Sequence, residues 1–211
     1  MSMTLKERRR DAVRADVAAM TLDLIREEGI DAVSIESICS ACSTSRSTIY
    51  SHFPDGRDGV LRAAYQQAGE TLIALARDRA RTVAGWDARI ASYARTMLEF
   101  SSSPNIGSFY SISGPHLMGF QARRGTGAQS YFDDIQGELT AAHAAGDLPE
   151  EADPSMLATL FVSSLRDAGI AAADTPELCE RLVDSIWTIL NGLRALAMHT
   201  AEVRAPGGGE R

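Results

Sequence analysis

The sequence is poor in cysteine, whose disulfides stabilise small secreted domains, and it has no long apolar stretch. Its 211 residues contain only three cysteines, too few for the disulfide framework of a secreted protein. No apolar run approaches the ~18 residues of a membrane-spanning helix. The charged start, residues 1–10, has no apolar segment behind it, so we expect no signal peptide. These absences favour a cytoplasmic protein with no membrane partner.

Motifs of catalysis and metal binding are also missing. There is no nucleophile motif and no phosphate-binding loop, and the four histidines are scattered along the chain. Cys39 and Cys42 form a Cys-x-x-Cys pair, but zinc usually needs four ligands and Cys179 stands alone. On one helix these two thiols would share the buried face and act as small hydrophobes. We expect no enzyme, metal or cofactor; a thiol-based redox switch is the alternative for this pair.

The net charge of −7 at first argues against a nucleic-acid partner. Its distribution weakens that objection, because residues 1–62 hold nine Lys or Arg against ten Asp or Glu, and most of the acidity lies beyond them. Phosphate binding needs a local positive potential rather than a basic chain. Five basic residues gather near the amino end: Lys6, Arg8, Arg9, Arg10 and Arg14.

The most informative segment is residues 34–53, SIESICSACSTSRSTIYSHF, which predicts two short helices joined by a tight turn. Ile35, Ile38, Cys39 and Cys42 recur at i, i+3, i+4 and i+7, the spacing of one helix face. Ser34 precedes them and is a good N-cap, because its hydroxyl can accept from a free backbone N–H.

The second short helix has a narrow apolar side and a wide polar one. Ser45 is its N-cap candidate, and Ile49 and Phe53 form the side that would be buried. The outward residues are Arg46, Ser47, Thr48, Tyr50 and Ser51. A small helix with that surface suits the major groove of DNA; the alternative is a polar, solvent-facing helix of a helical protein.

Residues 30–61 resemble the DNA-binding domain of the TetR family of bacterial transcriptional regulators. Gly29 ends the first helix, and Ile38-Cys39 stands where the family has isoleucine–alanine. Ile49-Tyr50-Ser51-His52-Phe53 closes the recognition helix, and Arg57 lies near the usual lysine. Three departures are visible: Ser43 and Thr44 replace the glycine and valine of the turn, the loop of residues 54–59 is one residue longer, and cysteines replace small residues at two packed positions. A non-glycine residue at positive φ carries some strain.

The resemblance implies an all-α protein of about nine helices. Residues 1–56 would form a helix-turn-helix DNA-binding domain, residues 57–204 a ligand-binding and dimerisation domain, and the glycine-rich residues 205–211 a disordered tail. The residues themselves support the helical class. Helical patterns cover residues 6–28, 58–82, 86–100 and 129–145, residues 105–120 predict a short or bent helix, and Asp153-Pro154 and Thr175-Pro176 mark two further helix starts.

The resemblance also implies which residues contact DNA. Arg46 is the best candidate for a base contact, to a guanine edge, and we expect phosphate contacts from Ser34, Tyr50, His52 and Arg57. The basic residues near the amino end would reach phosphates as such arms do in the family. The predicted DNA-binding residues are Ser34, Thr44, Ser45, Arg46, Ser47, Thr48, Tyr50, His52 and Arg57.

The apolar patterns of the last two predicted helices bear on whether the protein forms a dimer. Both carry apolar residues at helical spacing, and the last is apolar on more than one side. It is either a central core helix or a helix that packs on its own body and on a second subunit. The resemblance favours a homodimer with a four-helix interface, which presents two recognition helices about 34 Å apart to a palindromic site. The predicted interface residues are Leu157, Phe161, Leu182, Ile186, Ile189 and Leu193.

Aromatic residues and methionines concentrate between the DNA-binding segment and these last helices. Most belong to the core on general grounds. We expect a minority to line a pocket for a small, largely apolar effector, with residues 101–127 as a gate. The candidates are Trp86, Tyr93, Met97, Phe100, Tyr110, His116, Phe120 and Tyr131.

The sequence therefore predicts a ligand-responsive transcriptional repressor. It would bind a palindromic, double-stranded operator as a homodimer and be released by a small-molecule effector. Two alternatives stay open: a helical small-molecule-binding protein or enzyme without a DNA function, and a thiol-sensing regulator.

Overall fold

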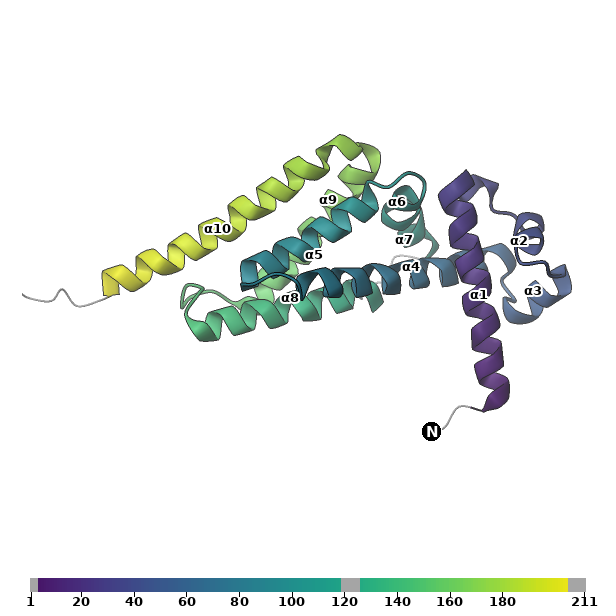
Figure 1. Cartoon of the computed structure of the whole chain (residues 1–211), viewed down its shortest axis with the longest axis horizontal. Coiled ribbons are helices and arrows are strands. Elements are labelled where there is room, and N and C mark those ends of the chain that lie inside the picture. The colour runs from purple at the N-terminus through teal and green to yellow at the C-terminus, as the bar shows by residue number, and fades with distance from the viewer. Residues whose placement is uncertain (1–3, 119–125, 205–211) are drawn as a thin grey trace, which may run out of the picture.

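The computed structural model describes residues 4–118 and 126–204, which form helices joined by short turns (Figure 1). Within these ranges there is no strand, so the all-α prediction is confirmed; the predicted tail, residues 205–211, lies outside them. The elements in chain order are α1 (Leu5–Glu28), the 3-10 turn η1 (Ile30–Ala32), α2 (Ile35–Ala41), α3 (Arg46–His52), α4 (Gly56–Ala80), α5 (Trp86–Ser101), α6 (Ile106–Ser108), the π-helix η2 (Phe109–Ser113), α7 (Gly114–Leu117), α8 (Thr126–Ala145), α9 (Pro154–Asp174), the 3-10 turn η3 (Pro176–Leu178) and α10 (Cys179–Arg204).

A first hydrophobic core lies among α1, α2, α3 and the first half of α4, which we call the head. Its most buried side chains are at most 1% exposed: Ile25, Ile38, Ile49, Phe53 and Leu61. Burying a side chain of this size stabilises a fold by about 1.5–3 kcal/mol. The two short helices of the head, α2 and α3, therefore depend on this core, since a seven-residue helix is not stable alone in water.

Hydroxyl side chains fix where the helices of the head begin. Ser34 accepts a hydrogen bond from the backbone N–H of Ser37 at 3.0 Å, and Ser45 accepts one from that of Thr48 at 3.2 Å. Both residues are N-caps, as the sequence predicts. Thr4 and Glu7 form a reciprocal capping box at the start of α1. Each cap satisfies a backbone donor that the first helical turn leaves free.

α4 contributes to two cores. Its 25 residues make a helix about 37 Å long. Val60 and Ala64 belong to the core of the head, whereas Leu72 and Ala76 belong to the core of the remaining helices, which we call the body. The predicted boundary after residue 56 thus falls in the first turn of a helix that both parts share.

The body consists of the second half of α4 with α5 to α10. Its core includes five side chains that are fully buried: Ile90, Ile135, Leu139, Ala158 and Leu190. α9 is the one helix in the described ranges that is long and apolar enough to cross a membrane. It carries the exposed pair Arg166 and Asp167 and buries Phe161 and Leu165 in this core, so it packs as a helix of the body.

A short irregular segment, α6–η2–α7, joins the head to the body. Ile106 and Phe109 pack into the core of the head. The side-chain amide of Asn105 donates to the carbonyl of Arg26 at the end of α1, at 3.1 Å. Residues 105–120 predict a short or bent helix, and the structure shows the interruption as a π-helix over Phe109–Ser113, a form often found at functional sites.

Substitution of Phe109 tests the packing of this junction. Its ring is 1% exposed, so Phe109→Ala should lower the free energy of unfolding by about 3–5 kcal/mol, measured by urea denaturation. Leu75→Ala is the control, because Leu75 is 42% exposed and its loss should cost little. Equal effects of the two changes would contradict the assignment of Phe109 to a core.

Candidate functional site

The turn between α2 and α3 is closed by backbone contacts and one left-handed residue. The N–H of Thr44 donates to the carbonyl of Cys39 at 3.0 Å. Ser43 has a φ of +48°, a conformation that costs a non-glycine residue some energy. The structure thus confirms a helix-turn-helix in which serine occupies the position of the usual glycine.

The amino-terminal end of α3 presents a cluster of hydroxyls and one guanidinium. The Ser45 hydroxyl lies 2.8 Å from that of Ser47 and 2.9 Å from that of Thr48. Arg46 is exposed and forms an ion pair with Glu36 of α2. Tyr50, one turn further along, is half exposed. This face offers hydrogen-bond donors of several lengths, as contact with base edges and phosphates requires.

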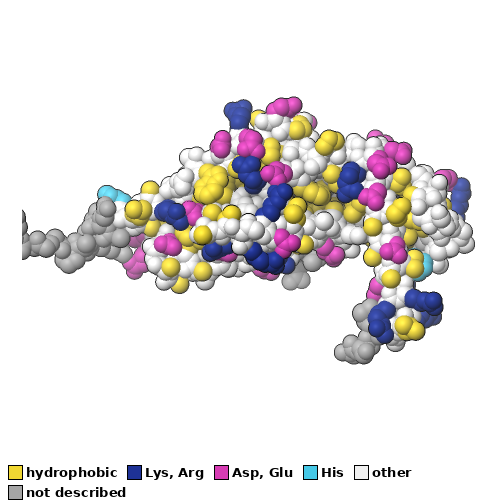
Figure 2. Space-filling model, viewed as in Figure 1, with side chains coloured by type: hydrophobic (Ala, Val, Ile, Leu, Met, Phe, Trp, Pro, Cys, Tyr) yellow, Lys and Arg dark blue, Asp and Glu magenta, His cyan; other side chains and the backbone are white. Residues whose placement is uncertain are grey.

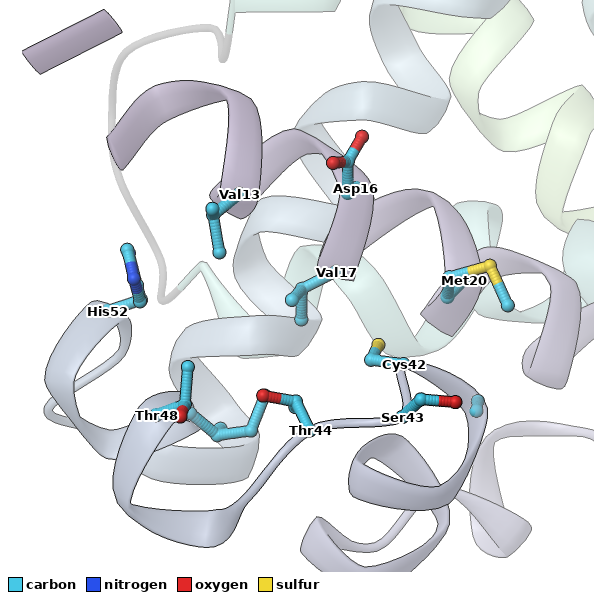
Figure 3. A pocket seen from close by; sticks show the side chains of 11 residues that line it. Val13, Asp16, Val17, Met20, Cys42, Ser43, Thr44, Thr48 and His52 are labelled. Carbon is cyan, nitrogen blue, oxygen red and sulfur yellow. The ribbon is translucent and has the colours of Figure 1, made fainter. Parts of the chain in front are cut away.

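Three other predicted DNA contacts line a cleft between α1 and the helix-turn-helix (Figure 3). The cleft has a volume of about 290 Å³, and Thr44, Thr48 and His52 form part of its wall. The Nδ1 atom of His52 is buried and has no hydrogen-bond partner. These side chains therefore border the space between α1 and the helix-turn-helix, and the hydroxyl of Thr48 also reaches the exposed cluster at the start of α3.

The guanidinium of Arg57 bonds to the backbone of the head. Its Nε donates to the carbonyl of Val33 at 2.6 Å, and its Nη2 donates to the carbonyl of Ile30 at 3.0 Å. These bonds tie the start of α4 to η1, next to Ser34, whose own hydroxyl caps α2. The side chain of Arg57 is 38% exposed, and its Nη1 lies 4.0 Å from a carboxylate oxygen of Asp58.

The basic residues near the amino end divide into two sets. Lys6, Arg8, Arg9 and Arg10 are exposed on the first turns of α1, and Figure 2 shows Lys and Arg side chains gathered where this helix projects from the molecule. Arg14 instead donates to the carbonyl of His52 and lies 4.4 Å from the centre of the Phe53 ring. Arg14 therefore anchors the end of α3, and the phosphate prediction stays with the other four.

The cysteines of the Cys-x-x-Cys pair are half-buried and free. Burial raises the pKa of the Cys42 thiol, and the neighbouring Cys39 raises it further. A raised pKa keeps a thiol protonated at neutral pH and lowers its reactivity, which disfavours the redox alternative. In the part of the chain that the structure describes, no group of three or more His, Cys, Asp or Glu side chains is placed to hold a metal ion.

The predicted ligand-binding residues of the body form two linked aromatic groups. Tyr93 and Tyr131 are buried with ring centres 5.6 Å apart. Tyr110 packs against Phe100 at 5.3 Å and stacks on Tyr65 at 5.2 Å. Tyr65 of α4 has no signal in the sequence, because its role follows only from where η2 folds back onto α4. Met97 lies beside these rings at the edge of the body core.

Some polar atoms of the body core are unsatisfied. The hydroxyl of Tyr131 and the indole N–H of Trp86 are buried and have no partner, which is costly unless a further group supplies one. By contrast, the Tyr93 hydroxyl donates to Asp134 at 3.2 Å. Burial, with the nearby carboxylate of Asp134, raises the pKa of Tyr93 to about 12.

Two ligand candidates lie elsewhere. His116 is exposed on α7, so its side chain is turned to solvent rather than into the aromatic region. Phe120 lies outside the described residues. The other six candidates all belong to or pack against the body core, with Tyr93 beside Tyr131 and Phe100 beside Tyr110. Trp86 lies apart from these rings, at the start of α5, where it packs with Arg194 of α10.

Within one chain, Phe161 is buried, Leu157, Leu182, Ile186 and Leu193 are half-buried and Ile189 is exposed, so their role in a dimer stays a prediction. Phe161 is in the body core, and Leu157, Ile186 and Leu193 pack against that core. Leu182 packs against a neighbouring buried cluster. Ile189 alone is largely exposed, at 55%. Helical spacing identified the apolar stripe but could not tell which side faces inward. The large apolar side chains left exposed on α9 and α10 are Met156, Leu160, Ile170, Ile189, Leu196 and Met198.

A family model described as "Bacterial regulatory proteins, tetR family" matches residues 18–64, which include α2, α3 and the turn between them. The amino-terminal domain belongs to the TetR family. A search of curated proteins gives no significant match, so this assignment stands on the domain and on the fold of the whole chain.

Solved structures share that whole fold. A TetR-family transcriptional regulator from Pectobacterium atrosepticum has a TM-score of 0.77 at 21% identity, with 91% of this chain and 98% of that chain covered. RolR in complex with resorcinol has a TM-score of 0.66 at 18% identity, covering 90% and 95%. FadR from Bacillus subtilis in complex with stearoyl-CoA has 0.64 at 14% identity, covering 82% and 95%. Our chain therefore has the fold of DNA-binding transcriptional regulators with a ligand-binding domain.

Substitution of Arg57 distinguishes a structural role of this side chain from a phosphate-binding role. Because its guanidinium bonds two backbone carbonyls, Arg57→Ala should lower the free energy of unfolding by about 1.5–3 kcal/mol, measured by urea denaturation without DNA. Arg62→Ala is the matched control, since Arg62 pairs only with the exposed carboxylate of Asp55 and should lose at most about 1 kcal/mol. If Arg57→Ala is as stable as the wild type, its bonds to η1 contribute nothing.

Proposed function

We propose that this protein is a transcriptional repressor that binds a palindromic operator as a homodimer and is released by a small, largely apolar effector. The observation that carries the proposal is the exposed Arg46 with its hydroxyl cluster, presented by the helix-turn-helix of a TetR-family domain. The same features favour a cytoplasmic regulator over an enzyme. Each part of the proposal draws on a separate surface of the molecule.

The DNA contacts we propose follow the exposure of the side chains. Arg46 would donate to a guanine edge in the major groove, with Ser47 and the half-exposed Tyr50 beside it. The exposed basic residues at the start of α1 would meet phosphates, where a compact positive charge is sufficient. The other predicted DNA contacts cap a helix, line the cleft or bond the backbone, and they would set the register of the head on the duplex. These residues are Ser34, Thr44, Ser45, Thr48, His52 and Arg57.

The exposed apolar faces of α9 and α10 support a homodimer. Leu160 is 64% exposed and Met198 is 63% exposed, although a monomer gains by burying side chains of this size. Figure 1 shows α10 extending past the ends of α5 and α8, so part of its surface has no neighbour within the chain. We propose that α9 and α10 of two copies form a four-helix interface through these faces.

The aromatic region of the body supports an effector site. The rings of Tyr93, Tyr110 and Tyr131 offer apolar walls, and the unpartnered hydroxyl of Tyr131 offers one polar contact, a combination typical of ligand sites. Two similar structures are complexes with resorcinol and with stearoyl-CoA, ligands that combine an apolar part with polar groups. We propose an effector that places a hydrogen-bonding group against Tyr131.

The junction between body and head supports the coupling of the two events. Tyr110 of η2 packs against the cores of both body and head, and its neighbour Phe109 belongs to the core of the head. A ligand that displaces Tyr110 would thus act on α1 and α4 through Phe109 and Asn105. It shifts the equilibrium between DNA-binding and released forms only by the difference in its affinity for the two.

Changing Arg46 tests the DNA-reading face. A duplex is first selected from random sequence by the wild-type protein, and binding is then followed by fluorescence anisotropy at fixed salt. Arg46→Ala should weaken discrimination between the selected duplex and its single-base variants at one position by about 1–3 kcal/mol. Ser51→Ala is the control, because its hydroxyl donates to the Thr48 carbonyl within α3. If the protein binds no duplex more tightly than the polyanion heparin, the proposed DNA-binding function itself is wrong.

Changing Leu160 tests the proposed interface. Leu160→Glu places a charge on an apolar face that we expect to be buried between subunits, so the dimer should dissociate to a monomer in light scattering after size exclusion. Leu75→Glu, on the exposed side of α4, should leave the mass unchanged. A dimer that survives the first change would place the interface elsewhere.

A further inference from the structure

A carboxylate stands on the surface that we propose contacts DNA. Glu36 lies in the first turn of α2 and pairs with Arg46, the first residue of α3. Both side chains are largely exposed, 60% for Glu36 and 66% for Arg46. An acidic group at this place repels the phosphates of an approaching duplex, so its presence beside the only arginine of α3 calls for a physical reason.

Stability does not provide that reason. Exposed ion pairs contribute about 0–1 kcal/mol, because water and salt screen them and two long side chains lose freedom. An acidic residue in the first turn also favours the helix dipole, but α2 already has a capping box formed by Ser34 and Ser37. Neither effect requires the partner to be Arg46, which lies on the next helix.

The geometry of the guanidinium suggests what the pair does. Arginine has five N–H donors in a planar fork, and a carboxylate that occupies one part leaves the others free. Guanine offers two acceptors, O6 and N7, that match such a fork. A phosphate attracts the guanidinium mainly through its full negative charge and carries no sequence information, whereas the guanine edge is uncharged. An arginine whose charge is offset in advance therefore loses more of its attraction to phosphates than of its fit to guanine.

We infer that Glu36 is a specificity-determining residue that acts through Arg46. It holds the guanidinium toward the groove and offsets its charge, so the protein binds arbitrary DNA less tightly while the base contact is retained. This inference rests on the proposed DNA-binding function. Its measurable consequence is a wider ratio between the affinities for selected and for arbitrary duplexes.

The test compares Glu36→Gln with the wild type on two duplexes, the selected one and a scrambled one, over a series of salt concentrations. Glu36→Gln should bind the scrambled duplex about two- to fivefold more tightly, the effect of one exposed ion pair, and its salt dependence should steepen by about one unit of slope, since one further cation faces phosphate. Affinity for the selected duplex should change less, so the ratio falls.

The matched control is Asp23→Asn. Asp23 is an exposed acid of the same domain, paired with Arg26 at 2.5 Å and 57% exposed, and its loss changes the net charge equally but away from α3. Its affinity ratio should match the wild type. Thermal unfolding of both variants should stay within about 0.5 kcal/mol of the wild type, as for other surface changes, which separates DNA reading from folding.

A second background shows whether Glu36 acts through Arg46. In Arg46→Ala, the further change Glu36→Gln should strengthen binding to both duplexes alike and leave their ratio unchanged. A fall in the ratio in this background, or an unchanged ratio and slope for Glu36→Gln alone with DNA binding intact, overturns the inference. Absence of binding to any duplex by the wild type overturns the proposed function instead, so the two failures are distinguishable.

Discussion

The fold depends on α4 being buried at both ends by different partners. Its first half completes the core of the head, and its second half completes the core of the body. A helix held in this way cannot tilt without disturbing both sets of contacts, because close-packed interiors transmit displacement rather than absorb it. The position of α3 is therefore determined by packing that reaches the aromatic region of the body.

The head shows how a helix too short to persist alone is kept in place. α3 has seven residues, and it is fixed by Ile49 and Phe53 below, by the Ser45 cap at its start and by Arg14 at its end. These contacts use one side of the helix and both of its ends. The remaining side takes no part in the core, so it can carry polar residues such as Arg46, Ser47 and Ser51.

Local patterns in the sequence predicted much of this structure. The N-caps Ser34 and Ser45, the buried Ile38, Ile49 and Phe53 and the all-α class all follow from spacing and side-chain chemistry over a few residues. The turn between the two helices follows from the same local pattern, and the resemblance to the TetR family added its identification as a helix-turn-helix.

What the sequence could not predict depends on contacts between distant segments. The donors of Arg57 meet carbonyls more than twenty residues away, and Arg14 meets His52, so both basic residues read as phosphate contacts when taken alone. The inward and outward faces of α9 and α10 are both apolar, and only the packed body distinguishes Phe161 from Leu160. The stacking of Tyr65 on Tyr110 likewise requires the fold of η2.

The π-helix of η2 limits how the length of this chain can vary. A π-turn holds one residue more than an α-turn over the same span. Here Phe109 lies in the core of the head, and the adjacent Tyr110 packs against the cores of both head and body. Deletion of a single residue between 109 and 113 would rewind the segment as ordinary α-helix and rotate one of the two rings by roughly 100°, the turn per residue of an α-helix. A chain without this residue would join head and body through a differently wound segment, so the length of η2 determines which aromatic side chains meet at the junction.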